Sequence, residues 1–315
     1  MSPESPAGCL FAAMVMYFEA LMGLLFWGVT SVSAANVSAV DDTGQTVQLS
    51  RPARRVISLA PHITELLFAA GAGDQIVGAA EFSDYPAGAL HIPRIGDATR
   101  VDRERIALLQ PDLVVAWGSG NPAAELQALR KLGIPVFVSE PRRLEDIPRQ
   151  LESLGRLTGH VETSQLAAQL FRSRLATLRD ANSSAERLEV FFQVASHPLI
   201  TLNGRHLINA VIELCGGRNI FGESAGLAPN VSIEAVVAAA PEVILYSEYP
   251  GHGSAELKSQ WGDWRTIPAV YRQQLFGIPA DVINRAGPRV LEGGTSICVA
   301  FDAVRRNRTA HQPGP

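Results

Sequence analysis

The chain has 315 residues, of which 47% are hydrophobic and 18% charged, and its formal net charge is −4. This length suits two compact lobes, and the composition is that of a folded rather than a disordered protein. A charge so close to neutral argues against a nucleic-acid partner, which would favour a basic surface.

The N-terminal segment has the pattern of a secretory signal. Residues 9–32 are apolar apart from Glu19, and small residues at Val32 and Ala34 predict cleavage after Ala34 and therefore a periplasmic protein. The first basic residue is Arg51, so the usual positive start of such a signal is missing. The alternative for residues 1–34 is an uncleaved membrane anchor, because the stretch is long enough to span a bilayer.

Strands and helices alternate from residue 54 to residue 143, the expected N-terminal lobe. Strands are predicted at Arg55–Ala60, Ile76–Ala80, Leu113–Trp117 and Val136–Ser139, and helices at Thr64–Ala70, Arg103–Leu109 and Ala123–Leu132. This alternation predicts a parallel sheet that is covered on both faces.

A linker region, residues 144–182, is predicted to be helical almost throughout. No Gly or Pro occurs from Val161 to Asp180, and Leu residues keep one face apolar, so this part is expected to be one continuous, stiff helix.

Residues 187–306 repeat the scheme as a C-terminal lobe. Strands are predicted at Leu188–Val194, Leu199–Leu202 and Gln274–Pro279, and a helix at His206–Gly217. The segment VSIEAVVAAAPEVILYS from Val231 also matches VDRERIALLQPDLVVAW from Val101, 130 residues earlier, with Glu104 and Glu234 at the same point. The chain thus contains a duplicated helix-then-strand unit, and two similar lobes are expected to bracket a cleft.

Ligands of parallel sheets bind at the carboxyl ends of the strands. There the sequence places Phe82, Tyr85 and Trp117 in the first lobe, and Asp281 to Arg285 in the second. Aromatic and polar side chains around one crevice favour a bulky, partly planar ligand. The alternative for each aromatic is packing in the core or on the surface.

Motifs of enzymes are not found. GAGDQIVG at Gly71–Gly78 follows a helix and leads into a strand, the reverse of the order that a dinucleotide site needs, and there is no nucleophile elbow, Walker loop or H-E-x-x-H. The histidines lack metal-ligand spacing, so neither a catalytic nor a metal site is predicted. Beyond the signal only Cys215 and Cys298 remain, which predicts one disulfide or two buried thiols.

Several motifs in order resemble one family. They are VISLAPHITELLFAAG, FSDYP, ERIALLQPDLVVAW, ELCGGRNIF and RAGPR followed by Cys298. From about Arg54 to Val304 the chain resembles the periplasmic cobalamin-binding proteins of ABC importers, within a group that also binds iron siderophores and haem. The resemblance implies an α/β fold with two Rossmann-like lobes, a ligand cleft between them and one long rigid helix that joins them.

The resemblance also implies roles for single residues. The corrinoid pocket would include Phe82, Trp117, Asp281 and Arg285, and Tyr85 is added to it because it follows the same strand as Phe82. The disulfide would join Cys215 to Cys298, and Glu104 and Glu234 would dock onto the ABC permease. At three further positions where the family pattern has an aromatic residue, this sequence has Ala98, Ile200 and Ala228 instead.

The expected protein is therefore a non-catalytic carrier without a cofactor, with cobalamin as its cargo. Three alternatives remain open. The ligand could instead be haem or a ferric siderophore, with His62 or His197 near the iron. The protein could be an enzyme of the tetrapyrrole chelatase type. The matched glutamates could simply stabilise the N-termini of their helices through the helix dipole.

Overall fold

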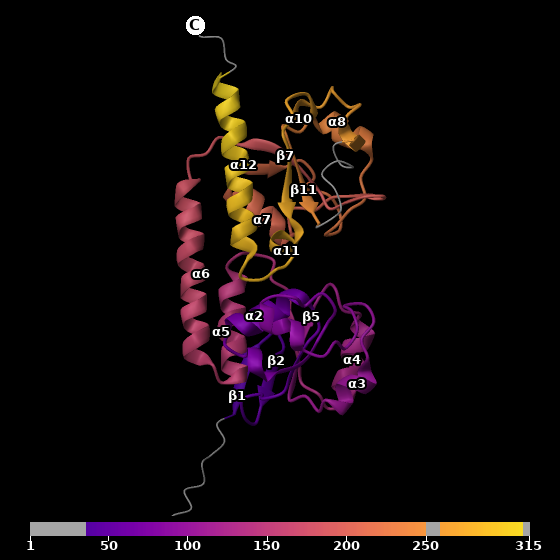
Figure 1. The fold of residues 1–315 in the computed structure, drawn as a ribbon, viewed down its shortest axis with the longest axis vertical. Coiled ribbons are helices and arrows are strands. Elements are labelled where there is room, and N and C mark those ends of the chain that lie inside the picture. The colour runs from indigo at the N-terminus through magenta and orange to yellow at the C-terminus, as the bar shows by residue number, and fades with distance from the viewer. Residues whose placement is uncertain (1–35, 250–258, 311–315) are drawn as a thin grey trace, which may run out of the picture. The chain divides into compact units, whose positions relative to one another are not determined.

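The computed structural model describes residues 36–249 and 259–310, and the predicted signal of residues 1–34 lies outside them. The described residues form two four-stranded parallel sheets and two antiparallel pairs, with helices around them (Figure 1). This arrangement confirms the predicted fold class.

The first sheet has the strand order β4-β3-β5-β6. Its strands are β3 (Val56–Ser58), β4 (Ile76–Ala79), β5 (Leu113–Trp117) and β6 (Val136–Ser139). Its helices are α2 (Pro61–Ala69), α3 (Arg103–Leu108), α4 (Ala123–Lys131) and α5 (Asp146–Thr158), with short 3₁₀ turns at Gly73–Gln75 and Ala87–His91. We call this unit, with the hairpin of β1 (Val37–Val40) and β2 (Thr46–Leu49), the first lobe.

Both faces of the first sheet are buried, which explains the unbroken apolar run of β5. Leu113 and Val115 join a core with α2 and α5, whereas Val114 and Ala116 join a separate core with α3 and α4. The strand is apolar on both sides because helices cover both faces.

The second sheet has the order β10-β7-β11-β12 and belongs to the second lobe. Its strands are β7 (Leu188–Gln193), β10 (Gly217–Asn219), β11 (Val243–Glu248) and β12 (Leu275–Pro279). Its helices are α7 (Leu207–Leu214), α8 (Ile233–Ala239), α10 (Pro268–Tyr271), α11 (Ala280–Ile283) and α12 (Val290–Ala310).

Two features of the second lobe differ from the prediction. The stretch Leu199–Leu202 adds no strand to the main sheet: only β9 (Leu199–Ile200) is extended, and it pairs antiparallel with β8 (Ala195–Ser196). The edge position next to β7 is taken by β10 instead. The long helix α12 lies in a stretch where the sequence pattern predicted no element.

The structure contains the duplicated helix-then-strand unit that the sequence predicts. α3 leads into β5 and α8 leads into β11, and each of these strands lies beside the strand that comes first along the chain in its four-stranded sheet, β3 or β7. Gln110 and Ala240, one at each helix end and directly before a proline, have left-handed backbones with φ of 46° and 48°. Such values are uncommon for residues other than glycine, so the repeat extends to the backbone of the turn.

A carboxylate after each proline secures the neighbouring strand. Asp112 accepts hydrogen bonds from the backbone N–H groups of Arg54 and Arg55 at 2.8 and 3.0 Å. Glu242, 130 residues later, accepts one from the backbone N–H of Glu189 at 3.0 Å. The same kind of side chain therefore holds the start of the central strand in both lobes.

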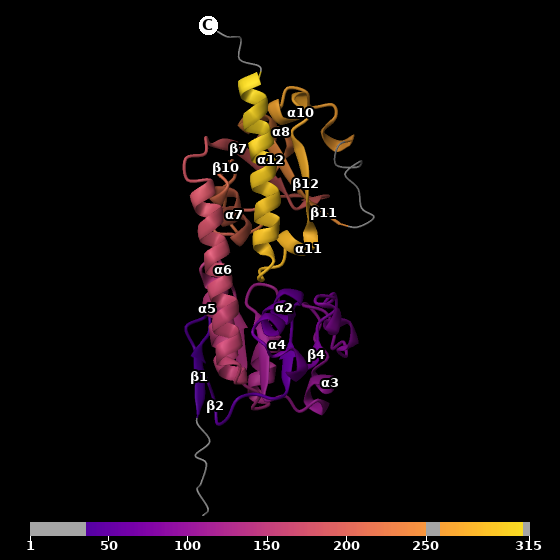
Figure 2. The ribbon, with the colours of Figure 1, turned by 60° about the vertical axis from the view of Figure 1, so that its left-hand side comes forward.

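The predicted linker region, residues 144–182, contains two packed helices, α5 of the first lobe and the helix that continues to the second lobe. α5 ends at Thr158 and α6 (Val161–Ala181) begins after Gly159, whose φ of 82° stops the first helix. A Cβ on Gly155 would lie 1.9 Å from Ser164 Oγ, so this glycine permits a close approach of α5 and α6. Figure 2 shows α6 running beside α5 and on to the second lobe. The prediction of an uninterrupted helix after Val161 is confirmed.

The predicted disulfide is also present. Cys215, at the end of α7, is bonded to Cys298 in α12. The alternative of two buried thiols is thereby excluded. Within the described ranges no helix is both long enough and apolar enough to cross a membrane.

Candidate ligand-binding site

Trp117 is the last residue of β5, at the carboxyl edge of the first sheet. Its backbone N–H donates to Asn121 Oδ1 at 2.7 Å, and its ring packs edge-on against His62 with the ring centroids 5.4 Å apart. A Cβ on Gly120 would lie 1.8 Å from the indole, so the ring covers this glycine. These contacts make Trp117 a fixed, half-buried wall at the strand end.

Phe82 and Tyr85 lie in the loop that follows β4. The Phe82 side chain is 76% exposed, and its backbone is left-handed with φ of 64°. A large side chain in this backbone region is strained, and strain of this kind is concentrated at functional sites. Tyr85 is 46% exposed. The loop therefore presents two aromatic rings that the fold itself does not bury.

Arg285 connects the two lobes at this loop. Its guanidinium donates to Asp84 Oδ1 at 2.6 Å and to the backbone O of Phe82 at 3.2 Å, both in the first lobe. It also donates to Asp281 Oδ1 in α11 at 3.0 Å. The structure thus brings Phe82, Asp281 and Arg285, three of the predicted ligand residues, into direct contact.

Glu65 and Arg289 complete this cluster. Glu65, in α2, has a side chain only 2% exposed and accepts hydrogen bonds from both Arg285 and Arg289. The Arg289 guanidinium also stacks on the Tyr85 ring, 3.8 Å from its centroid. The prediction missed Glu65, Asp84 and Arg289, although each lies inside a motif that carried the family resemblance. Each is a single charged residue or one of two within its motif, and the sequence does not show which residue it pairs with.

The charges of the cluster stabilise one another. Burial would raise the pKa of Asp84, but the hydrogen bond and positive charge of Arg285 outweigh it and lower that pKa below its ordinary value. Burial acts to lower the pKa of Arg285, but the hydrogen bonds that it donates to Asp84 and Glu65 outweigh this and raise that pKa above its already high value. Both groups stay charged at neutral pH.

His62 links Trp117 to the charged cluster. Its side chain is buried, and burial, with the positive charge of Arg285, lowers its pKa to about 3. The imidazole is therefore neutral at physiological pH. Its Nε2 has no hydrogen-bond partner among the described residues. His197, the other histidine considered, is exposed at the turn between β8 and β9.

The second lobe contributes a small polar network at the end of β11. Ser247 Oγ lies 2.8 Å from Asn284 Oδ1, and Asn284 donates to the Tyr249 hydroxyl at 3.0 Å. Residues 250–258, which follow Tyr249, lie outside the described ranges. Among described residues, no group of His, Cys, Asp and Glu side chains is arranged to hold a metal ion.

The two matched glutamates occupy equivalent places. Glu104 is the second residue of α3 and Glu234 the second residue of α8, and both side chains are exposed. Neither takes part in an ion pair within the described part of the chain. Each helix is capped by its own side chain, Asp102 or Ser232. Both helices lie on the side of their lobe away from α6 (Figure 1).

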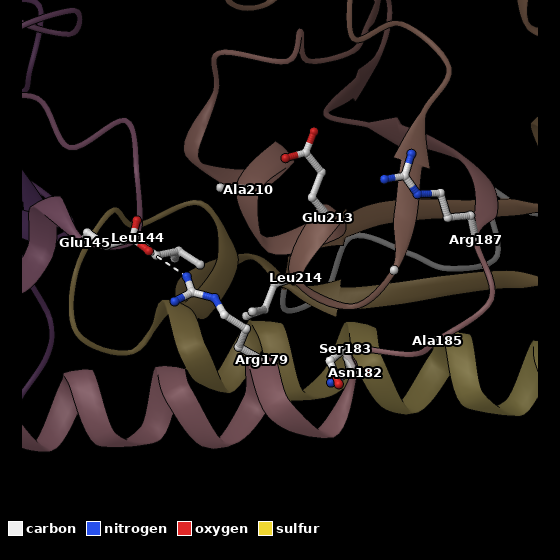
Figure 3. Close-up of a pocket in the computed structure, with 11 residues that line it drawn as sticks. Leu144, Glu145, Arg179, Asn182, Ser183, Ala185, Arg187, Ala210, Glu213 and Leu214 are labelled. Carbon is white, nitrogen blue, oxygen red and sulfur yellow. Dashed lines mark hydrogen bonds and ion pairs between the residues drawn. The ribbon is translucent and has the colours of Figure 1, made fainter.

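A separate pocket lies away from these residues, where α6 meets α7 (Figure 3). It has a volume of about 400 Å³ and is lined by residues of both signs, among them Glu145, Arg179 and Glu213. Arg179 is paired with Glu145 at 2.6 Å, and Glu213 accepts a hydrogen bond from Asn209 at 2.9 Å. Because Arg179 and Glu145 are paired with each other and Glu213 is bonded to Asn209, we regard the pocket as a surface hollow beside the linker and not as the ligand site.

Known proteins resemble the chain over most of its length. The family model described as periplasmic binding protein matches residues 56–282. A vitamin B12-binding protein of Vibrio parahaemolyticus is 37% identical over 82% of this chain and 93% of its own, and one of Vibrio cholerae is 40% identical over 81% and 91%.

Solved structures agree. The periplasmic vitamin B12 binding protein BtuF of Vibrio cholerae is 38% identical, covers 81% of this chain and 99% of its own, and superposes with a TM-score of 0.76. The haem-binding protein RhuT from Roseiflexus, at 23% identity and a TM-score of 0.71 over 80% and 98%, shares the fold. With a family model that covers most of its residues and relatives of this similarity, the chain belongs to the periplasmic binding protein family.

Proposed function

We propose that this protein captures cobalamin in the crevice formed by Phe82, Tyr85, Trp117, Asp281 and Arg285, and delivers it to an ABC transporter permease. The observation that carries the proposal is the identity of 37% and 40% to vitamin B12-binding proteins over more than four fifths of the chain. The exposed rings of Phe82 and Tyr85 support it, because a macrocycle binds through broad apolar contact.

The charges at the crevice favour a corrinoid over haem. The carboxylates of Glu65, Asp84 and Asp281 face the guanidinium groups of Arg285 and Arg289, so this cluster has a net charge of −1. Both arginines are already paired with carboxylates. Haem carries two propionates that would need unpaired cations, whereas the edge of cobalamin carries amides, which bind well to paired polar groups.

Docking is proposed to use Glu104 and Glu234. Their exposure, their matched positions and the absence of an ion pair to either in the described residues leave both carboxylates available to basic residues of a permease. The Glu234 carboxylate accepts hydrogen bonds from its own backbone N–H and from Ser232, and these lower its pKa below the ordinary value. The protein would act in the periplasm, with residues 1–34 as the export signal or as a membrane tether.

Calorimetric titration tests the ligand. Protein purified from the periplasm of an expressing bacterium is titrated separately with cyanocobalamin, haemin and a ferric hydroxamate. Tight binding of cyanocobalamin alone supports the proposal. Binding of haemin or the hydroxamate in its place would assign the protein to another branch of the family, and metal insertion into a porphyrin would reveal an enzyme.

A further inference from the structure

A buried carboxylate joins the lobes at the edge of the crevice. Glu65 Oε1 accepts from Arg285 Nη1 at 3.0 Å and from Arg289 Nη2 at 2.6 Å, and Glu65 Oε2 accepts from Arg289 Nε at 2.9 Å. With Asp84, which accepts from Arg285 at 2.6 Å, these four residues form what we call the clasp. The Glu65, Arg285 and Arg289 side chains are 2%, 11% and 16% exposed, so the pairs that Glu65 makes are shielded from water, whereas the Asp84 side chain is 49% exposed.

The two acids of the clasp belong to the first lobe and the two arginines to the second. Glu65 lies in α2 and Asp84 in the loop after β4, whereas Arg285 and Arg289 lie between α11 and α12. All of the bonds above therefore cross from one lobe to the other. A shielded ion pair is weakened little by salt, and the loss of one partner leaves an uncompensated buried charge.

Arg285 and Arg289 make different contacts outside Glu65. The guanidinium of Arg289 is occupied by Glu65, the backbone O of Asp281 at 3.3 Å and the Tyr85 ring. That of Arg285 reaches further, to the backbone O of Phe82, beside the exposed ring at the crevice. Among the described residues, Glu65 is the acid whose carboxylate binds both guanidinium groups, so it fixes Arg285 relative to Arg289 and to the aromatic loop.

We infer that Glu65 is a positioning residue, which holds the lobes closed through the clasp and orients Arg285 toward the ligand. The inference rests on the proposed function for the ligand, but the closure of the lobes can be measured without one. Glu65→Gln keeps the shape of the side chain, yet it removes the charge and directs an amide N–H toward the guanidinium donors. The lobes then lose their ionic connection, and Arg285 loses one of its supports.

The experiment combines a distance measurement with binding kinetics. Spin labels on Gln127→Cys in α4 and Ala238→Cys in α8, two exposed positions, report the distance between the lobes in the ligand-free protein. Stopped-flow mixing with cyanocobalamin gives the association and dissociation rates. For Glu65→Gln we expect a longer and broader distance distribution and a dissociation rate about 10-fold to 100-fold higher, the usual effect of losing hydrogen bonds between charged groups.

Two further variants make the test specific. Glu152→Gln breaks a Glu–Arg pair of 2.7 Å, with Arg172, that joins α5 to α6 and not the lobes, and it should change neither readout. Arg289→Gln should show the phenotype of Glu65→Gln in weaker form, and the double variant should be no worse than Glu65→Gln, because the two residues act through one contact. Arg289→Gln, at a less buried position, also answers the question if Glu65→Gln fails to fold.

The outcomes separate the two claims. An unchanged distance distribution and dissociation rate in Glu65→Gln, or in Arg289→Gln where the former does not fold, would overturn the clasp. If the unaltered protein fails to bind cyanocobalamin, the proposed function is wrong, and the distance measurement still decides whether Glu65 holds the lobes together.

Discussion

Gly120→Ala offers a sharp test of the aromatic wall, because it should displace Trp117 without removing any atom of the site. The added Cβ would lie 1.8 Å from Trp117 Cε3 and 2.3 Å from two other indole atoms. Ordinary contacts between such atoms are about 3.5–4.0 Å, so the ring must move by about 2 Å or the backbone must yield. The Gly120 backbone is not in the left-handed region, so the clash with the indole is the main consequence of the substitution.

The expected loss of affinity follows from the role of the ring. A central aromatic contact is worth about 1–3 kcal/mol of binding free energy, so titration with cyanocobalamin should show binding weakened about 5-fold to 150-fold. Overpacking should cost about 1–3 kcal/mol of folding stability, measured by chemical denaturation. Near-ultraviolet circular dichroism of the ligand-free protein should show that the indole has moved.

Trp117→Ala supplies the matched control. Once the indole is gone, a methyl group at Gly120 no longer clashes with it, so Gly120→Ala in that background should have little further effect on affinity. Two results would refute the reasoning: normal affinity in Gly120→Ala despite a displaced indole, or full additivity of the two substitutions. Either one would make Trp117 a core residue outside the binding wall.

Three other predictions concern His62, the disulfide and the matched glutamates. Burial holds the pKa of His62 at about 3, so below pH 6.5 the unfolded chain takes up a proton that the folded protein does not. The free energy of unfolding should therefore fall by up to about 1.4 kcal/mol per pH unit as the pH drops from 6.5 toward 3. His62→Gln should flatten that slope in denaturant titrations between pH 6.5 and 5, and an unchanged slope would contradict the assignment. Replacing Cys215 and Cys298 together by Ala should lower the free energy of unfolding by about 2–5 kcal/mol, since the bond closes a loop of 83 residues; a loss below 1 kcal/mol would mean that the loop is ordered in the unfolded state. Charge reversal of Glu104 and Glu234 to Lys should abolish permease co-purification while leaving ligand affinity unchanged, whereas a pure helix-dipole role predicts normal co-purification with a stability loss of about 0.3–1 kcal/mol for each.

Several elements could be predicted because local signals defined them fully. β5 has the predicted bounds, Leu113–Trp117, since a short apolar run is enclosed by Pro111 and Gly118. α12 could not be predicted in this way, because Gly293 and Gly294 near its start suppress the helical pattern. In the structure these glycines pack closely against Ile283 and Val211, so tertiary contacts, and not local preference, maintain the helix there.

The site was predictable in its parts but not in its connections. Phe82, Trp117 and Arg285 could be proposed because they follow strands or belong to a recognisable motif. The acidic partners of Arg285 in the first lobe could not, since Glu65 lies 220 residues away in the chain and any exposed acid would have seemed an equal candidate. Only the fold selects the acid that becomes buried beside the guanidinium.

The braced linker has a mechanical consequence. The chain passes between the lobes once, through α6, and the pair of Arg172 and Glu152 and the close approach at Gly155 hold this helix to α5. Any opening of the lobes would therefore have to bend the chain near the end of α6, where it enters the second lobe. Glu104 and Glu234 belong to α3 and α8, and these two helices lie on the side of their lobes away from α6 (Figure 1). If a permease binds at α3 and α8 as proposed, a force applied there acts at a distance from α6 and therefore turns one lobe relative to the other more effectively than the same force applied beside α6.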